Sequence, residues 1–442
     1  MWFIILPFFQ NKNVREIMRI CIFEDELYKK LLPLVYFRPV YDLKCGITTL
    51  REKIVRSFTG SAVALHSRSY LADVLKERNP GTVVNEIPPS VKDVLFLNGR
   101  LIASQKEVQS FGNQYPGKDM AYWKGDVVVA AWVSGSNLDS LRKQIKEGNT
   151  LSGQAFRAME KKEAAEATLI NFPWELIHHN GTQITSDFEY MTGGHPKVLG
   201  TVYEGAHLLN PSNIHIAEGA KVKPGVVLDA EEGPIFISKN ARILPNAVIE
   251  GPAFVGENSL VRVGAKVYLN TSIGETCKVG GEVEDTIIHA YSNKQHEGFI
   301  GHAYLGEWVN IGADSNNSDL KNDYGNVKVY NDGKLVDTGS QFVGLTMGDH
   351  SKCGINSMFN TGSVVGVCCN IFGSGMPPKF VPSFGWGGGA EGLTVYKMVK
   401  AIEVAKRVML RRKMTLSVAG ENLFKEVFEL TRGERTAAGI ED

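Results

Sequence analysis

An aliphatic residue occupies every sixth position over a long stretch of the second half of the chain. A six-residue period fits neither an α-helix nor an alternating β-strand. The positions in this run are Ile237, Ile243, Ile249, Val255, Val261, Val267, Ile273 and Val279. Most of these aliphatic residues have a small residue two positions before them. Three positions before them lie residues that tolerate a left-handed backbone, namely Asn240, Asn246, Asn258, Gly264 and Asn270. Each hexapeptide therefore predicts a short strand followed by a tight corner.

Three such hexapeptides close one coil, and stacked coils predict a left-handed parallel β-helix of hexapeptide repeats. The period continues on both sides of the central run, with a phase shift at Glu231–Gly233. Its further members are Ile216, Val222 and Leu228 upstream, and Phe299, Leu305, Ile311, Met347, Cys353, Phe359, Val365 and Ile371 downstream. We expect the coils at about residues 211–375, within a domain that spans 196–390.

The preceding part of the chain has a different pattern. Over residues 19–195 short apolar segments alternate with helical ones, which predicts an α/β, Rossmann-like domain. We expect strands at 20–23, 62–65, 94–97 and 127–131, helices at 140–148 and 152–164, and a linker at 195–210.

The last part of the chain predicts a hairpin and helices. Residues 316–341 leave the six-residue period, and Asn331-Asp332-Gly333 between two apolar segments is a hairpin signal. After a Pro- and Gly-rich passage, residues 392–414 form an amphipathic pattern with a basic end, and 422–431 predict a second helix, so 391–442 should be C-terminal helices. At the other end, residues 1–18 suggest a start extension, with Met18 as the true initiator. The apolar segment Trp2–Phe9 is too short to span a membrane.

Composition narrows the function. The chain has 442 residues, with 48 basic and 48 acidic side chains, so a surface that binds nucleic acid broadly is excluded and any phosphate binding is local. The six cysteines form no C-x-x-C motif and occupy positions suited to small or apolar residues. They predict reduced packing residues of a cytoplasmic protein without a membrane partner.

Candidate chemistry concentrates at one polar cluster within the repeats. A coil wall needs small and aliphatic residues, yet residues 292–297 read Ser-Asn-Lys-Gln-His-Glu. Packing does not require His296 there, and an imidazole titrates near neutral pH, so it can serve as a general base. The alternative is that His296 lies in a solvent-exposed turn and has no catalytic role.

The segment His296-x-x-Phe299, followed by Asn310-Ile-Gly-Ala313, resembles the bifunctional glucosamine-1-phosphate N-acetyltransferase and N-acetylglucosamine-1-phosphate uridylyltransferase family (GlmU). Residues 316–321 and the first-domain segments Arg38-Pro and Gly46–Lys53 resemble the variant branch of that family in Bacteroidetes-type bacteria. The resemblance implies acetyl transfer from acetyl-CoA to glucosamine-1-phosphate, uridylyl transfer from UTP with Mg²⁺, and a homotrimer with active sites between neighbours.

The resemblance also assigns roles to residues of the β-helix. His296 is the general base, Glu282 orients it, Asn310 contacts the sugar and Arg262 the phosphate. Two family residues are missing: Phe299 stands where the family has tyrosine, and Glu284 where it has a second phosphate-binding lysine. Candidate substitutes are Tyr304 for the hydroxyl, and Lys294 or Lys321 for the cation. The residues expected at acetyl-CoA are Gly354, Asn356, Gly373 and Lys379.

The first domain departs further from the family. No glycine-rich loop follows its first strand, and Asn98 stands in place of a metal-binding aspartate, although Mg²⁺ prefers carboxylates. Two interpretations are open. In the favoured one a rearranged nucleotide site is formed by Arg38, Arg51, Lys53 and Arg100, with Asp187 as the metal ligand. In the other, the domain no longer transfers nucleotides.

Three competing functions follow. One is a sugar acyltransferase with a vestigial first domain, or one that acts on another amino-sugar. A second is a non-catalytic scaffold subunit, because such domains joined to hexapeptide coils also serve in assembly. A third is a metal-dependent hydratase whose ligands would be His289, His296 and His302, which requires three converging imidazoles.

Overall fold

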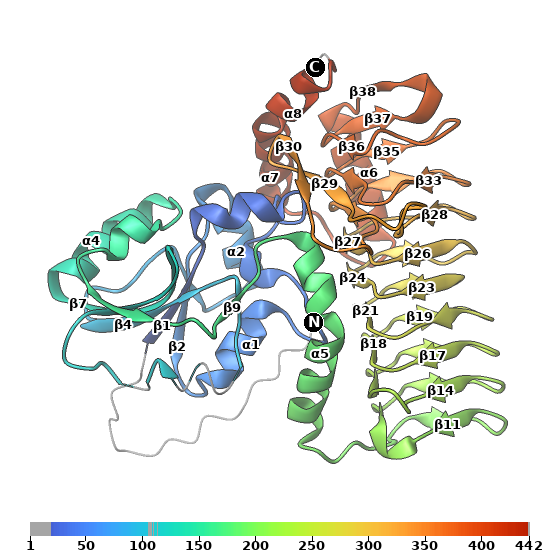
Figure 1. Ribbon diagram of the computed structural model, residues 1–442, viewed down its shortest axis with the longest axis horizontal. Coiled ribbons are helices and arrows are strands. Elements are labelled where there is room, and N and C mark those ends of the chain that lie inside the picture. The colour runs from blue at the N-terminus through green and yellow to red at the C-terminus, as the bar shows by residue number, and fades with distance from the viewer. Residues whose placement is uncertain (1–18, 105–107, 109, 113, 441–442) are drawn as a thin grey trace.

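The computed structural model describes residues 19–440, except 105–107, 109 and 113. The predicted start extension, with Met18, lies outside the described residues. Figure 1 shows an α/β domain beside a tall stack of coils, with the C-terminal helices near one end of the stack. The predicted fold class, an α/β domain followed by a parallel β-helix and C-terminal helices, is confirmed.

The first domain is built on a seven-stranded mixed sheet with the order β3-β2-β1-β4-β7-β6-β8. Its strands are β1 (Arg19–Phe23), β2 (Ala62–Leu65), β3 (Val83–Val84), β4 (Asp93–Asn98), β6 (Met120–Lys124), β7 (Val127–Ser134) and β8 (Glu160–Glu163). All four predicted strands are present. Strand β1 lies between the parallel strands β2 and β4, so a crevice for ligands is expected at the carboxyl ends of β1 and β4.

The helices of this domain were only partly predicted. They are α1 (Leu50–Ser57), α2 (Ala72–Arg78), α4 (Gly135–Glu147) and α5 (Pro173–Thr192). The expected helix at 140–148 belongs to α4. The expected helix at 152–164 is wrong, since a short 3-10 turn there leads into β8, a fully charged edge strand. Helix α5 was missed because its buried face includes the polar residues Asn180 and Asp187, which interrupt the apolar pattern.

Three parallel sheets form the walls of the β-helix, and the chain crosses them in the order sheet I, sheet II, sheet III in each coil. Sheet I contains β10 (Thr201–Val202), β13 (Lys221–Val222), β16 (Arg242–Ile243), β19 (Leu260–Val261), β22 (Lys278–Val279) and β25 (Asn293–Lys294). Sheet II contains β11 (His207–Leu209), β14 (Val227–Asp229), β17 (Val248–Glu250), β20 (Lys266–Val267), β23 (Glu282–Glu284) and β26 (Phe299–Gly301). Sheet III contains β12 (Ile214–Ile216), β15 (Ile235–Ile237), β18 (Ala253–Val255), β21 (Thr271–Ile273), β24 (Ile287–Ala290), β27 (Tyr304–Glu307), β31 (Thr346–Met347), β34 (Val364–Val365) and β36 (Phe380–Val381).

The hexapeptide pattern explains this architecture residue by residue. The eight aliphatic residues of the central run are buried inside the coils, and the predicted corner asparagines have positive φ, between 56° and 61°. Two details differ. The coils begin within the predicted linker, at β10, and Ile300 rather than Phe299 points inward, because the inward residue before Leu305 lies five and not six positions ahead of it.

The later coils add β28 (Asn316–Asn317), β32 (Lys352–Cys353), β33 (Met358–Phe359), β35 (Asn370–Ile371) and β37 (Gly385–Gly387). The predicted hairpin is confirmed as β29 (Lys328–Asn331) and β30 (Lys334–Asp337). Of the segment 392–414, residues Leu393–Val395 form β38 and the helix α6 (Met398–Leu410) follows. The second predicted helix is α7 (Val418–Leu430), with α8 (Arg432–Ala437) after it. None of the helices in the described ranges has the length and apolar character needed to cross a membrane.

The first domain covers sheet III. Helix α5 packs on β18, β21 and β27, and in Figure 1 it runs along the stack. The side chain of Tyr304 is fully buried at this contact, where its hydroxyl accepts from the Lys44 amide and donates to the Lys44 carbonyl. Sheets I and II remain on the other sides of the stack.

Candidate active sites

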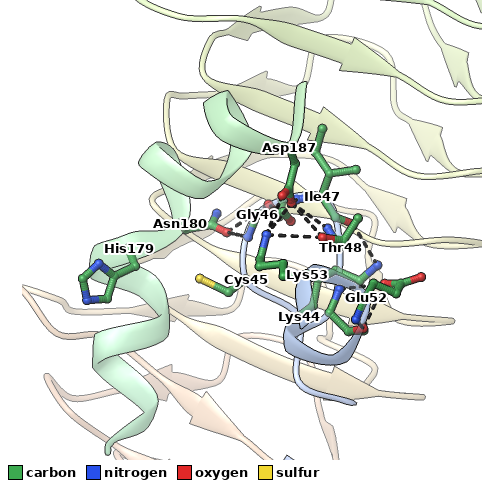
Figure 2. Close-up of polar contacts among 12 residues, drawn as sticks. Lys44, Cys45, Gly46, Ile47, Thr48, Glu52, Lys53, His179, Asn180 and Asp187 are labelled. Carbon is green, nitrogen blue, oxygen red and sulfur yellow. Dashed lines mark hydrogen bonds and ion pairs between the residues drawn. The ribbon is translucent and has the colours of Figure 1, made fainter. Parts of the chain in front are cut away.

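An ion-pair cluster around Asp187 braces the first domain, as Figure 2 shows. The Lys53 ammonium lies 2.6 Å from both carboxylate oxygens of Asp187, and Arg56 donates to one of them at 2.7 Å. The amides of Ile47 and Thr48 donate to the same carboxylate. Burial alone would raise the pKa of Asp187, but Lys53 and Arg56 hold it below its usual value. The Asp187 carboxylate is thus surrounded by donors of this chain, and its role as a metal ligand stays a prediction.

The same loop docks onto the β-helix. The Gly46 amide donates to Asn180 of α5 at 2.7 Å, and the Gly46 carbonyl accepts from Ser272 of β21. Gly46 has a φ of +82°, and a Cβ there would lie 2.6 Å from the Gln183 carbonyl carbon, so only glycine fits. The segment that resembles the family around Gly46 is therefore an interdomain joint in this chain.

The other cations of the predicted nucleotide site also have separate partners. Arg38 is 1% exposed and donates to Asp349 at 2.5 Å, in the interdomain contact. Arg51 contacts Asp42 and Asn79, while Arg100 is buried against Asp25 at 2.6 Å. The structure does not bring Arg38, Arg51, Lys53 and Arg100 together. Each of these cations pairs with a carboxylate of the chain, and one rearranged phosphate site stays a prediction.

Ion pairs also fill the crevice at the carboxyl ends of β1 and β4. Asp25 accepts from both Arg100 and the Asn98 amide, the latter at 2.9 Å. Glu24 accepts from the Arg68 guanidinium at 3.1 Å and from the Val40 amide. Asn98 therefore acts as a hydrogen-bond donor to a carboxylate here.

An open cleft of about 570 Å³ adjoins this crevice. It is lined by Glu26, Trp123, Asp126, Ser152, Gly153, Gln154, Arg157, Met159 and Lys161. Within the described part of the chain, Arg157 and Lys161 form no ion pair, and neither do Glu26 and Asp126. The Lys161 ammonium lies 5.1 Å from the centre of the Trp123 ring. No sequence pattern predicted this cleft, because its charged residues lie on a surface strand and on loops without a regular spacing.

The second candidate site lies at the corner between sheets I and II. His296 is exposed there, and the backbone oxygen of His296 lies where a Cβ on Gly281, one coil away, would meet it at 2.7 Å. A Cβ on the neighbouring Gly280 would meet both the Gln295 oxygen and the Arg262 Cβ. Gly280 and Gly281 therefore leave a stretch of backbone without side chains between the coil of Arg262 and the coil of His296.

Glu282 and Asn310 lie on the walls beside this corner. Glu282 pairs in register with Phe299, and its carboxylate is 3.9 Å from Lys266. Asn310 lies on the outer surface of the sheet I wall and accepts a long, 3.4 Å hydrogen bond from Asn293. Over the residues described, no hydrogen bond joins His296 to Glu282. Over the described residues, no hydrogen bond or ion pair joins any two of Arg262, His296, Glu282 and Asn310, and their common site stays a prediction.

Two predicted substitutes are excluded by their surroundings. The Lys294 ammonium points into the coil and donates to the carbonyl oxygens of Gly280, His296 and Glu297. Burial lowers its pKa to about 8. Tyr304 is buried against the first domain. Lys294 therefore holds the His296 corner from inside, and neither residue reaches a surface ligand.

The residues expected at acetyl-CoA lie on the later coils. Asn356 is exposed at a corner with a φ of 55°, close to Gly354 in sequence. Lys321 pairs with Asp323, and the pKa of the half-buried Lys379 is lowered by burial and by Lys321 nearby. Beside Gly373, the Ser374 amide donates to the Glu391 carboxylate at 3.0 Å. The chain's own carboxylate therefore occupies the loop at Gly373.

The hydratase interpretation is wrong. His289 is buried and donates to the Asp42 carbonyl, His302 donates to Asp319 at 2.8 Å, and His296 lies at another corner. No group of three or more His, Cys, Asp or Glu side chains in the described ranges is arranged to hold a metal ion.

The first domain has a known family. Residues 20–196 match the family model described as sugar nucleotidyl transferase, so the chain carries a sugar nucleotidyltransferase domain. The chain is 30% identical over 131 residues to the bifunctional protein GlmU of Rippkaea orientalis, a match that covers 25% of this chain and 29% of that protein. It is 31% identical over 174 residues to a bifunctional sugar-1-phosphate nucleotidylyltransferase/acetyltransferase of Sulfurisphaera tokodaii, covering 34% and 43%. The chain thus spans less than half of these distant relatives.

The matching solved structures are covered over most of their own length, but their sequence identity and TM-score are low. A UDP-N-acetylglucosamine acyltransferase from Campylobacter jejuni covers 56% of this chain and 85% of its own, with 15% identity and a TM-score of 0.22. The Francisella novicida enzyme of the same description covers 53% and 91%, with 15% identity and a TM-score of 0.25.

Proposed function

We propose that the β-helix transfers the acetyl group of acetyl-CoA to the amine of glucosamine-1-phosphate. The observation that carries this is the exposed His296 beside the backbone of Gly280 and Gly281, with the exposed Arg262 one coil further along the stack. Adjacent coils are about 4.8 Å apart, so the two residues bracket a gap of roughly 10 Å, which suits a sugar phosphate.

In this reaction the side chains of the corner have distinct tasks. Neutral His296 takes a proton from the substrate amine, whose nitrogen then attacks the thioester carbon. A C–N bond forms and the C–S bond breaks. The second proton that the nitrogen loses passes to the departing CoA thiolate, and His296 releases the first to solvent. Arg262 binds the phosphate through its planar guanidinium. Asn310 faces the sugar, and Glu282 orients the imidazole once substrate closes the site.

Acetyl-CoA would lie along the later coils. Gly354 and Asn356 offer a corner with a glycine, and the neighbouring cations Lys321 and Lys379 suit its phosphates. Gly373 would contribute only after Glu391 moves away. Following the family, we infer a homotrimer located in the cytoplasm.

For the first domain we propose uridylyl transfer from UTP to N-acetylglucosamine-1-phosphate in the open cleft. An oxygen of the sugar phosphate attacks the α-phosphorus, and pyrophosphate leaves. Arg157 and Lys161 would bind phosphates, and Glu26 and Asp126 are the carboxylates that would hold Mg²⁺. Mg²⁺ neutralises the negative charge of the triphosphate.

A second candidate is a single-activity acyltransferase with a vestigial first domain. Its support is the pairing of Glu24 with Arg68 and of Asp25 with Arg100, which occupies the carboxylates nearest the crevice. A paired assay decides: thiol release with acetyl-CoA and glucosamine-1-phosphate, and pyrophosphate release with UTP, N-acetylglucosamine-1-phosphate and Mg²⁺. Release of both products supports the bifunctional enzyme, and release of thiol alone supports the second candidate. Absence of both products would indicate a non-catalytic scaffold.

A further inference from the structure

One column of residues runs along the outer surface of sheet I, from the coil of Arg262 to the coil of Asn310. Leu260, in the coil of Arg262, is the register partner of Lys278. Lys278 is in turn the partner of Asn293, and Asn293 is the partner of Asn310. Lys278 and Asn293 therefore lie between the residue expected at the phosphate and the residue expected at the sugar.

The basic end of the C-terminal helix reaches the same surface. Arg411 and Arg412 directly follow α6, and Arg412 donates through Nη2 to the Asn293 side chain at 3.0 Å. The Asn293 amide group donates to the Asn310 side chain at 3.4 Å. A short series of hydrogen bonds thus connects Arg412, far along the chain, to the residue expected at the sugar.

The cations of this surface repel one another. Burial lowers the pKa of the half-buried Lys278, and four guanidinium groups lower it further, those of Arg412, Arg411, Arg262 and Arg242. These groups come from three strands of sheet I and from the segment after α6, so the chain concentrates positive charge here from two distant parts of the sequence.

The carboxylates at the corners that lead into these strands have partners of their own. Glu275 lies 3.4 Å from the Lys44 ammonium, and Glu257 accepts a hydrogen bond from Asn258. Among the residues that the structure describes, neither Lys278 nor Arg412 forms an ion pair. Uncompensated positive charge of this kind attracts an anion from solution.

The charge and the number of donors suit a phosphate monoester. Its dianion has three oxygens that accept hydrogen bonds, more than one guanidinium group satisfies. Lys294 cannot assist Arg262, because its ammonium donates to carbonyl oxygens inside the coil. Arg242 lies two strands from Lys278, on the side away from Asn310. Lys278 and Arg412 are the cations that lie next to the column between the two expected contacts.

We propose that Lys278 and Arg412 bind, together with Arg262, the phosphate of the amino-sugar substrate, so that the end of the C-terminal helix completes the acceptor site of the β-helix. The Lys278 ammonium supplies a point charge, and the Arg412 guanidinium supplies planar donors at a fixed angle. The bond to Asn293 uses one nitrogen of Arg412 and orients the remaining donors. This inference rests on the acetyl transfer proposed above.

The test measures binding separately from reaction. Isothermal titration calorimetry gives the dissociation constants of glucosamine-1-phosphate, glucosamine and acetyl-CoA for wild type, Lys278→Met and Arg412→Gln. We expect each variant to bind glucosamine-1-phosphate roughly tenfold more weakly, through loss of a charge-assisted contact, and to bind acetyl-CoA as wild type does. In the thiol-release assay the KM for the sugar phosphate should rise while kcat is retained, which a merely structural role would not produce.

Two matched controls remove one charge nearby without touching the site. Lys221 lies on the same face of sheet I, three strands or about 14 Å from Lys278, and Lys413 follows Arg412 as an exposed residue. Lys221→Met and Lys413→Met should bind glucosamine-1-phosphate like wild type. Arg412→Lys, which keeps the charge but loses the planar donors, should recover part of the affinity.

The 3′-phosphate of coenzyme A has the same chemistry, and the two titrations separate the sources. Weaker binding of acetyl-CoA with unchanged binding of glucosamine-1-phosphate overturns the proposal, as does wild-type affinity for both ligands in Lys278→Met and Arg412→Gln. Thiol release with an unchanged KM in these variants rejects the phosphate site and keeps acetyl transfer. Binding that depends on Lys278 and Arg412 without thiol release keeps the site and rejects the reaction.

Discussion

Lys53 and Asp187 form an ion pair that excludes solvent completely, with the ammonium 2.6 Å from both carboxylate oxygens. Lys53 comes from α1 and Asp187 from α5, the helix that lies on the β-helix. The pair therefore links the loop at Gly46, which contacts β21, to the interior of the first domain. Its charges stabilise the joint between the domains.

Removal of one partner should be costly. In Lys53→Met the Asp187 carboxylate stays buried with only Arg56 as a cation, and we expect the free energy of unfolding to fall by about 3–5 kcal/mol. Urea unfolding of the full chain measures this. Lys76→Met is the matched control, because Lys76 pairs with Asp73 on the exposed surface of α2 and should change stability by less than about 1 kcal/mol. Equal losses in the two variants would contradict a structural role of the buried pair.

The β-helix could be predicted from the sequence because each inward position repeats one local requirement. The spacing alone predicts that Ile243, Ile249 and Val255 point into the coil, and their distant partners need not be known. The rule fails where the spacing shortens, as at the five-residue step between the inward residues Ile300 and Leu305, which leaves Phe299 outside the coil. It also fails at Lys294, a charged residue in an inward position, because carbonyl oxygens of the corner replace water around its ammonium.

The charged residues of the first domain could not be placed from the sequence for a different reason. A surface site and a buried ion pair draw on the same residue types, and only the partner distinguishes them. Arg38 pairs with Asp349, which lies 311 residues away in the sequence, and Lys53 pairs with Asp187, which lies 134 residues away. Neither separation leaves a local pattern. Both cations had been predicted in a rearranged nucleotide site, but Arg38 lies in the interdomain contact and Lys53 joins two helices of the first domain.

His302 should make stability depend on pH. Burial opposes its charge, but the hydrogen bond to Asp319 and the nearby Asp285 raise its pKa above the usual value. Because the folded-state pKa is the higher one, the stabilisation is complete below the unfolded pKa of about 6.5 and is lost as pH rises through the folded pKa. We expect Asp319→Asn to remove this contribution. The measurement is the unfolding free energy of wild type minus variant, from pH 5.5 to 8.5.

The difference should shrink as pH rises. Subtraction cancels the opposite trend of His289 and His350, whose pKa values are lowered by burial in both proteins. The exposed pair of Lys321 with Asp323 offers a control, since Asp323→Asn leaves His302 untouched. A difference that grows toward alkaline pH would count against a protonated His302.

Lys161 and Lys162 test the cleft of the first domain, because they alternate on β8. Lys161 lies over Trp123 in the cleft, whereas Lys162 lies over Tyr122, which is no part of its lining. We expect Lys161→Ala to raise the KM for the phosphorylated substrate about tenfold in the pyrophosphate assay, through loss of a charge-assisted contact of about 1.5–3 kcal/mol. Lys162→Ala should match wild type. Identical kinetics in both variants would exclude the cleft as the phosphate site.

His296 carries the acetyl-transfer proposal. Its imidazole is exposed at a corner held from inside by Lys294, so His296→Ala should leave the fold and the thermal midpoint unchanged. Loss of a general base should lower kcat about 10²- to 10⁴-fold in the thiol-release assay with glucosamine-1-phosphate. The deficit should narrow toward alkaline pH, where more substrate amine is already deprotonated, and a missing phosphate contact would show no such trend. His207→Ala, an exposed histidine at the far end of sheet II, is the control. Should His296→Ala release thiol at the wild-type rate, the base must be another group, and this corner of the β-helix would lose its assigned chemistry.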